Sequence, residues 1–305
     1  MTLHPQAAAA LELWSVGPKV TDPGFGPKGI DAMRADARIA AASEPKEDVA
    51  RIEAVDADGV RCRLYLPEGP EVAAPSVLVF LHGGGFVFGD VETHDAQSRR
   101  IANRTEMAVL AVDYRRPPEH HFPAAPDDVD TALAWLLSNG DRHGLDTTRC
   151  ALVGDSAGAN LALVASLRNT DAICAAVLVY PFLDPGTGSA SYAATDGGLT
   201  RDEARWFWSQ YARTAADLTD PDLAPLKSTH SRFRGLQEPV LIQAAEHDVL
   251  LDENIELARR LEDAGVDVRL TTYPGMIHGF WRHPDMFDAA EASWAEMAAF
   301  LSEHV

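Results

Sequence analysis

The sequence Gly154-Asp155-Ser156-Ala157-Gly158 decides the fold, because an apolar run from Cys150 to Gly154 precedes Ser156 and a helical pattern follows it. A serine at such a junction is typical of a nucleophile elbow, in which a sharp, strained turn exposes the serine side chain. Only small neighbours fit beside a serine in that turn. The turn also directs the backbone N–H of Ala157, at a helix N-terminus, toward an oxyanion. An ordinary glycine-rich loop between a strand and a helix is the alternative interpretation.

Apolar runs rich in β-branched residues alternate with amphipathic stretches on both sides of this motif. The alternation predicts an α/β fold with a mostly parallel, doubly wound central sheet. The predicted strands are Ser76 to Leu81, Ala108 to Asp113, Cys150 to Gly154, Ala175 to Tyr180, Pro239 to Ala245 and Val268 to Tyr273. The predicted helices lie near Thr93 to Arg104, Pro126 to Ser138, Ser156 to Leu167, Asp252 to Ala264 and Met286 to Leu301. Upstream, Val49 to Ala57 and Arg61 to Leu66 alternate around Asp58-Gly59, which predicts an antiparallel hairpin at the N-terminal edge.

A second glycine-rich motif, His82-Gly83-Gly84-Gly85, follows another apolar strand. Consecutive glycines allow backbone N–H groups to converge on a ligand without obstruction by side chains. No Gly-Lys-Ser/Thr sequence follows, which disfavours a phosphate-binding loop. We therefore expect this loop to complete an oxyanion hole with Ala157, and we expect His82 to brace the loop rather than react.

A serine hydroxyl needs a nearby base to become a nucleophile. In the order serine, acid, histidine along the chain, His278 lies just beyond the last predicted strand and is the candidate base, with His283 as its nearest competitor. Asp248 follows the preceding strand and is the candidate acid, whereas Asp252 resembles the N-cap of the next helix.

Charge and targeting features restrict the partners. The 26 basic and 46 acidic residues give a formal net charge of -20, which disfavours nucleic acids and anionic lipid surfaces and favours a neutral substrate. The apolar stretch Ala7 to Leu11 is interrupted by Glu12 and contains no cation, unlike a secretory signal, and no apolar run is long enough to span a bilayer. These features predict a cytoplasmic protein without stable membrane association.

The three cysteines, Cys62, Cys150 and Cys174, include no closely spaced pair. A disulfide framework and a zinc site are therefore not expected, and the scattered histidines show no metal-ligand spacing. The sequence predicts no metal and no organic cofactor.

Together these motifs resemble the bacterial hormone-sensitive-lipase family (family IV) of esterases, in which an HGGG motif precedes a GDSAG elbow. The segments Asp113 to His120, Phe122 to Ala125, Asp248 to Glu253 and Ile277 to Phe280 are also similar to that family, and the resemblance covers about residues 60 to 302. It implies an α/β-hydrolase fold with a helical cap, and a serine carboxylesterase that forms an acyl-enzyme. It also implies a triad of Ser156, Asp248 and His278, and oxyanion donors from Gly84, Gly85 and Ala157 rather than Gly83.

The resemblance divides the chain into residues 1–45 and 184–234, which would form the cap, and residues 46–183 and 235–305, which would form the catalytic domain. Phe86, Trp206, Phe207 and Phe280 are candidates for the substrate pocket, although an aromatic cluster at helical spacing, with Trp208 and Tyr211, is equally typical of a cap helix packed on a core.

The expected partner is a small ester with a short or medium acyl chain, acted on by a monomer or a homodimer. An amidase, formamidase or lactonase would use the same triad, so these activities remain alternatives. A binding protein of the same fold without turnover is a further alternative. The roles of Asp155 and Glu119 stay open, because each could orient a loop or bond only to local backbone.

Overall fold

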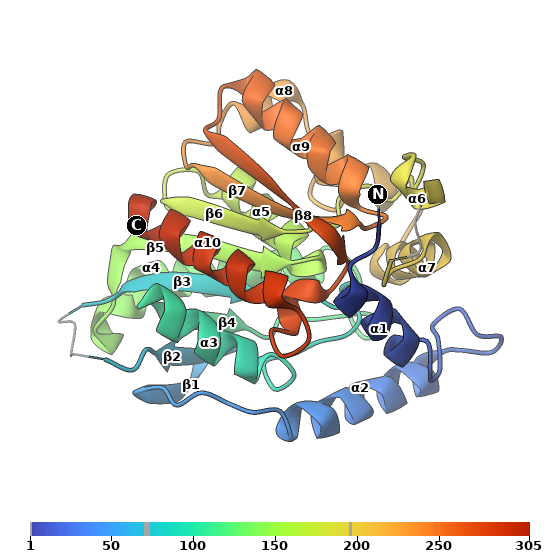
Figure 1. The fold of residues 1–305 in the computed structure, drawn as a ribbon. Coiled ribbons are helices and arrows are strands. Elements are labelled where there is room, and N and C mark those ends of the chain that lie inside the picture. The colour runs from blue at the N-terminus through green and yellow to red at the C-terminus, as the bar shows by residue number, and fades with distance from the viewer. Residues whose placement is uncertain (1, 70–73, 195–196) are drawn as a thin grey trace.

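The apolar runs form a single sheet in the computed structural model, which describes residues 2–69, 74–194 and 197–305. Within these residues the sheet has eight strands in the order β1-β2-β4-β3-β5-β6-β7-β8 (Figure 1). They are β1 (Arg51–Ala57), β2 (Val60–Leu66), β3 (Ser76–Leu81), β4 (Ala108–Val112), β5 (Asp146–Asp155), β6 (Ala175–Val179), β7 (Val240–His247) and β8 (Val268–Ile277). Strands β3 to β8 pair in parallel with their neighbours, whereas β2 pairs antiparallel with both β1 and β4. The predicted mostly parallel sheet with an antiparallel N-terminal edge is confirmed.

The hairpin of β1 and β2 turns at Asp58 and Gly59, between the paired residues Ala57 and Val60. Both turn residues have positive φ, 52° and 95°, which is the conformation that a two-residue hairpin needs to match the twist of its strands. The Gly59 N–H donates to the Asp56 carboxylate at 2.6 Å. The Asp-Gly dipeptide therefore fixes the register of the whole edge.

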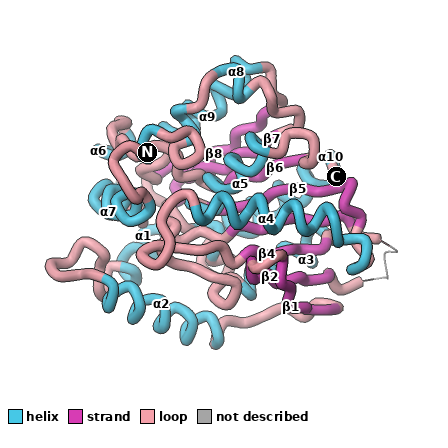
Figure 2. Tube along the Cα trace, turned by 180° about the vertical axis from the view of Figure 1, so that it is seen from behind, coloured by secondary structure: helices cyan, strands magenta, loops and turns pink. Residues whose placement is uncertain are grey.

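Helices cover both faces of the sheet, and Figure 2 shows the second face from behind. The longer helices are α1 (Pro5–Trp14), α2 (Pro27–Ala42), α3 (Asp95–Thr105), α4 (Ala124–Asn139), α5 (Ala157–Arg168), α7 (Arg201–Tyr211), α9 (Leu251–Ala264) and α10 (Asp288–His304). The short ones are η1 (Gly140–His143), α6 (Ser191–Ala194), η2 (Asp217–Thr219), η3 (Pro225–Lys227), α8 (His230–Phe233) and η4 (Phe280–Arg282). Ile101 of α3 and Trp294 of α10 belong to the core on one face, and Val129 of α4, Leu161 of α5 and Leu257 of α9 to the core on the other.

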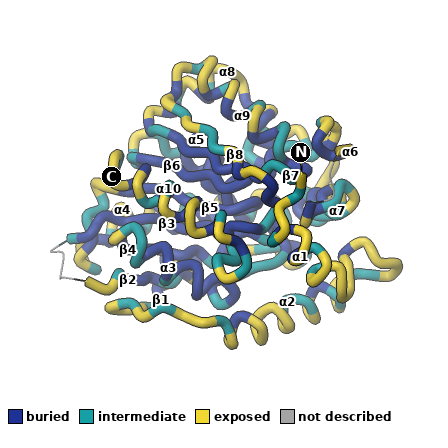
Figure 3. Tube along the Cα trace, in the orientation of Figure 1, coloured by how far each residue is buried: buried dark blue, intermediate teal, exposed yellow. Residues whose placement is uncertain are grey.

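Helices α1, α2, α6 and α7 gather at the end of the sheet toward which the parallel strands run (Figure 1). In Figure 3 the central strands are buried along most of their length, whereas α2 is largely exposed. In α/β sheets, ligands bind beyond the carboxyl ends of the strands. The helices at this end therefore surround the place where a site is expected.

The last two strands run further toward this end than the sequence predicts. Strand β8 continues past Tyr273 to Ile277, and β7 continues to His247, with an irregularity in their pairing between Ala245 and His247. Pro274, which interrupts the apolar pattern, is exposed and lies in the edge strand β8, where the lack of an N–H is tolerated. His278 thus follows the strand directly.

Candidate active site

Ser156 lies at the turn between β5 and α5, with φ 54° and ψ -116°. This conformation is strained for a residue with a side chain, and such strain concentrates at functional sites. Both flanking residues must be glycine, because a side chain at either position would collide with neighbouring backbone atoms. A Cβ on Gly154 would lie 2.4 Å from the backbone of Gly158, and a Cβ on Gly158 would lie 1.9 Å from the carbonyl oxygen of Leu81. The predicted elbow is therefore present at the end of a buried strand.

Ser156, His278 and Asp248 meet although they are far apart in the chain. The Nε2 atom of His278 lies 3.1 Å from Ser156 Oγ, and its Nδ1 atom lies 2.7 Å from Asp248 Oδ2. Asp248 is buried, and its other oxygen accepts the backbone N–H of Leu250 at 3.0 Å. These distances allow proton transfer from the serine hydroxyl to an imidazole that a carboxylate orients.

The competing histidine, His283, lies outside this arrangement. Its ring packs against Trp14, with ring centroids 5.4 Å apart. Burial lowers the pKa of His283 to about 4. This histidine therefore serves the packing of α1 against the core.

Asp252 does not cap α9, contrary to the expectation from sequence. Helix α9 begins at Leu251, one residue before the predicted start at Asp252, and its N-cap is Leu250. Asp252 Oδ2 instead accepts the backbone N–H of Ser191 at 2.8 Å. The neighbouring Glu253 is buried and accepts the backbone N–H groups of Leu183 and Asp184 at 3.3 and 2.8 Å. Burial raises the pKa of Glu253 well above its usual range. Both carboxylates thus tie the segment after β6 to the helix that follows Asp248.

Two residues of the glycine loop, Gly84 and Gly85, line the same cavity as Ser156. Gly84 and Gly85 have φ of 115° and 60°, and a Cβ on Gly84 would lie 2.3 Å from the carbonyl oxygen of Phe88. Among the described residues, the N–H groups of Gly84, Gly85 and Ala157 have no hydrogen-bond acceptor. The Gly83 N–H is different, because it donates to Asp155 Oδ1 at 2.8 Å. Asp155 is therefore bonded to the loop that faces Ser156.

His82 is buried beneath the glycine loop. Its ring stacks on Tyr114 at a centroid distance of 4.2 Å, and the Tyr114 hydroxyl donates to the His82 carbonyl oxygen at 2.6 Å. Burial lowers the pKa of His82 to about 4, so the ring is neutral near pH 7. Both contacts brace the loop, and Tyr114 is a support that the sequence analysis missed.

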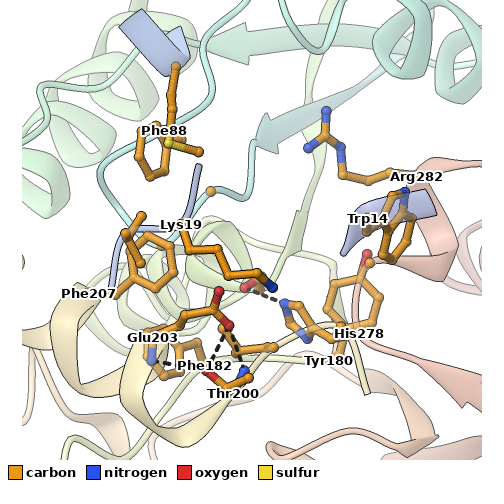
Figure 4. Close-up of a pocket in the computed structure, with 18 of the residues that line it drawn as sticks. Trp14, Lys19, Phe88, Tyr180, Phe182, Thr200, Glu203, Phe207, His278 and Arg282 are labelled. Atoms are coloured by element: carbon orange, nitrogen blue, oxygen red, sulfur yellow. Dashed lines mark hydrogen bonds between the residues drawn. The ribbon is translucent and has the colours of Figure 1, made fainter. Parts of the chain in front are cut away.

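A cavity of about 530 Å³ opens at Ser156 and His278 (Figure 4). Its walls come from four parts of the chain: the α1–α2 segment, the glycine loop, the strand ends and the region from Gly198 to α7. The lining residues are Leu11, Trp14, Ser15, Pro18, Lys19, Val20, Met33, Gly84, Gly85, Phe88, Asp155, Ser156, Tyr180, Phe182, Gly198, Leu199, Thr200, Glu203, Phe207, His278, Gly279 and Arg282.

Of the four predicted pocket residues, Phe207 lines this cavity. Phe86 does not, because its positive φ of 64° places its buried ring on Tyr211, with centroids 3.8 Å apart. Phe280 is buried against the rings of Tyr180 and Tyr273, and Trp206 packs on Phe88; neither residue lines the cavity. The aromatic cluster thus serves both roles that the sequence left open.

Other cavity residues were missed. Tyr180 directly follows β6 and Arg282 lies four residues after His278, so position next to a strand end or to the histidine was the signal available. Trp14 and Lys19 come from the N-terminal segment, where no motif marked them.

The role of Glu119, which the sequence left open, is structural. Its carboxylate accepts an N–H of Arg34 from α2 at 2.7 Å, so it links that helix to the loop after β4.

In residues 2–69, 74–194 and 197–305, no cluster of His, Cys, Asp and Glu is arranged to hold a metal ion. The same residues include no helix long and apolar enough to cross a membrane.

Comparison with known proteins gives consistent matches. A family model described as alpha/beta hydrolase fold matches residues 78–282. The chain is 32% identical to an ethyl acetate hydrolase of Pseudomonas putida, covering all of both chains, and 35% identical to the carboxylic ester hydrolase LipN of Mycobacterium tuberculosis, covering 81% of this chain and 67% of that one. A crystal structure of an alpha/beta hydrolase from the Lake Arreo metagenome matches with a TM-score of 0.88 and 33% identity over 98% of both chains. A hyperthermophilic esterase from Pyrobaculum calidifontis matches with a TM-score of 0.88 and 30% identity over 99% of both chains.

Proposed function

Because the chain belongs to the hormone-sensitive-lipase-like family of alpha/beta hydrolases and is a carboxylic-ester hydrolase, we propose that Ser156, His278 and Asp248 form its catalytic triad. The observation that carries this proposal is the continuous chain of hydrogen bonds from Asp248 through His278 to Ser156, with distances of 2.7 and 3.1 Å. It ends at a serine that faces a cavity large enough for a small ester.

In the proposed mechanism, His278 accepts the Ser156 proton as Oγ attacks the ester carbonyl carbon. The resulting oxyanion is stabilised by the N–H groups of Gly84, Gly85 and Ala157, which need no reorganisation because the fold already holds them. The imidazolium then protonates the leaving alcohol oxygen, and the acyl-enzyme forms. A water molecule, deprotonated by His278, attacks the acyl carbonyl and releases the acid and free Ser156.

Asp248 keeps the imidazole in the required tautomer. Its carboxylate is bonded to Nδ1, so Nε2 is left free to accept the serine proton. The carboxylate also stabilises the positive imidazolium without taking its proton. The buried position of Asp248 strengthens this effect, since few water molecules screen the charges there.

Short and medium acyl esters are the proposed substrates. The cavity volume of about 530 Å³ lies within the range of small-molecule sites, and Phe182, Leu199 and Phe207 give it an apolar wall. The name of the Pseudomonas putida relative, ethyl acetate hydrolase, agrees with a small substrate. An amide would need the same triad, and the ester-hydrolase relatives favour the ester.

We further assign residues 1–45 and 184–234 to a cap over the cavity, and residues 46–183 and 235–305 to the catalytic domain. Cavity residues such as Trp14, Met33 and Phe207 come from the two cap segments, whereas the triad comes from the catalytic domain. The division therefore separates the groups that shape the substrate site from the groups that react.

The test is a series of p-nitrophenyl esters of graded acyl length, with matched amides, given to the wild type, Ser156→Ala and His278→Ala. The matched control is Ser231→Ala, since Ser231 is exposed on α8 away from the cavity. Loss of the nucleophile or the base is expected to reduce kcat by a factor of about 10³ or more. Equal rates for the wild type and Ser156→Ala would refute the assignment, and faster cleavage of the amides would favour an amidase.

A further inference from the structure

Two hydrogen-bond donors on one wall of the cavity have no part in the mechanism above. Arg282 lies in η4, four residues after His278, and Tyr180 directly follows β6. The ring of Tyr180 lies 4.6 Å from the ring of His278, measured between centroids. Figure 4 shows Arg282 and Tyr180 on the side of the cavity that carries His278, across from Phe207. Both residues line the cavity.

The donors of these two residues are poorly matched by the protein. Within the described part of the chain, Arg282 forms no ion pair, and its guanidinium makes one long hydrogen bond, 3.4 Å, to the carbonyl oxygen of Thr93. Its Nε atom and the Tyr180 hydroxyl are buried without a partner among those residues. Buried donors without acceptors cost free energy, and the guanidinium group is suited to carboxylate oxygens. The wall therefore fits an anionic acceptor.

The two carboxylates in the cavity, Asp155 and Glu203, form no ion pair with Arg282 among the described residues. Asp155 Oδ1 accepts the Gly83 N–H at 2.8 Å, and Glu203 Oε2 accepts the N–H and the hydroxyl of Thr200 at 2.9 and 2.8 Å. In the described residues neither carboxylate lies within 4.0 Å of the guanidinium as an ion pair. Burial raises the pKa of Asp155, and the nearby charge of Arg282 opposes that rise without pairing with the carboxylate.

Lys19 supplies a second cation to the same cavity. It lies at the exposed mouth, and it too forms no ion pair with any residue that the structure describes. The net charge of -20 repels anions at a distance, so an anionic ligand depends on local cations of this kind.

The position of His278 decides which part of the ester meets this wall. The leaving alcohol oxygen must reach Nε2 of His278 to be protonated, so groups beside His278 border the alcohol part. We propose that Arg282 and Tyr180 bind a carboxylate on the alcohol part of the ester, so that the preferred substrates are short acyl esters of small hydroxy acids. This inference rests on the proposed function, because it assumes that His278 is the general acid.

The test compares acetoxyacetate with acetoxyacetamide, which differ only in carrying a carboxylate or a neutral amide. Each is hydrolysed with one water to acetate and either glycolate or glycolamide, and acetate release gives kcat/KM. The wild type is expected to prefer the anion. The ratio of kcat/KM for acetoxyacetate to kcat/KM for acetoxyacetamide is expected to fall about tenfold in Arg282→Gln, which loses a charged hydrogen bond. It is expected to fall about threefold in Tyr180→Phe, which loses a neutral one.

The matched control is Arg142→Gln, because Arg142 is exposed in η1 at the opposite end of the sheet. This substitution changes the net charge by the same amount as Arg282→Gln. It is expected to keep the wild-type ratio. An Arg282→Gln ratio within twofold of the wild type, or a wild type that prefers the amide, would overturn the carboxylate site.

A further measurement needs no variant. Glycolate is expected to inhibit p-nitrophenyl acetate hydrolysis by the wild type competitively and at lower concentration than glycolamide, and equal inhibition would also overturn the proposal. Failure of the proposed function is distinguishable, because it would appear as p-nitrophenyl acetate hydrolysis that does not depend on Ser156.

Discussion

Replacing Asp155 by Ala is expected to lower kcat while the fold and KM change little. Asp155 is buried, and its carboxylate accepts the Gly83 N–H at 2.8 Å, which fixes the loop that carries Gly84 and Gly85, the proposed oxyanion donors. A hydrogen bond to a charged group contributes about 1.5–3 kcal/mol. If the loop loses that amount of preorganisation in the transition state, kcat falls roughly 10- to 150-fold.

Asp155→Asn is the informative companion variant. Its amide oxygen can still accept the Gly83 N–H, but without charge, so the bond contributes only about 0.5–1.5 kcal/mol and part of the activity is retained. The assay is steady-state hydrolysis of p-nitrophenyl acetate by both variants, with circular dichroism and thermal melting to verify the fold. A folded Asp155→Ala with kcat within twofold of the wild type would refute the positioning role, as would an Asn variant no better than the Ala variant.

Three further variants test the packing and titration of buried groups. Trp208→Ala should lower the free energy of unfolding in urea by about 3–5 kcal/mol, since Trp208 is buried on α7 against Phe182. Trp206 is partly exposed, so Trp206→Ala should lower it clearly less, and equal losses would contradict the packing described. Gly158→Ala should cost about 3 kcal/mol or more, because its Cβ would meet a backbone oxygen at 1.9 Å, and a Tm equal to that of the wild type would disprove the close contact. The Glu253→Gln variant should become more stable relative to the wild type as pH rises above 4.5. In the wild type, Glu253 ionises at lower pH in the unfolded chain than in the folded protein, so rising pH favours unfolding, and the variant lacks this effect. A Tm difference between the two proteins that stays constant from pH 4 to 8 would contradict this.

The sequence predicts the central sheet and the serine elbow well because local chemistry determines both. A serine elbow needs glycine on both sides, and a parallel strand buried on both faces needs a continuous apolar run. Both signals are local, so strand β3 is predicted to its end residues and the meeting of Ser156, His278 and Asp248 follows from the order of strand ends.

The predictions for the cavity wall and for Asp252 depend on contacts that are distant in sequence. Phe86 and Phe280 look alike in sequence to Phe207, yet the positive φ of Phe86 and the aromatic neighbours of Phe280 bury both rings away from the cavity. Aspartate is a residue type typical of an N-cap, but the hydrogen-bond partner of Asp252 is Ser191, which lies 61 residues away in the sequence. Such choices are decided by tertiary packing, which periodicity does not encode.

The common direction of the parallel strands has a practical consequence for attaching the protein to a solid support. The proposed triad of Ser156, Asp248 and His278 lies where those strands end, so the opposite rim can be linked to a surface without covering the cavity entrance. Cys174 stands there, just before β6 begins, and it is partly exposed, whereas Cys62 and Cys150 are buried. A maleimide-coated bead would therefore hold the protein by Cys174 with its cavity facing the liquid.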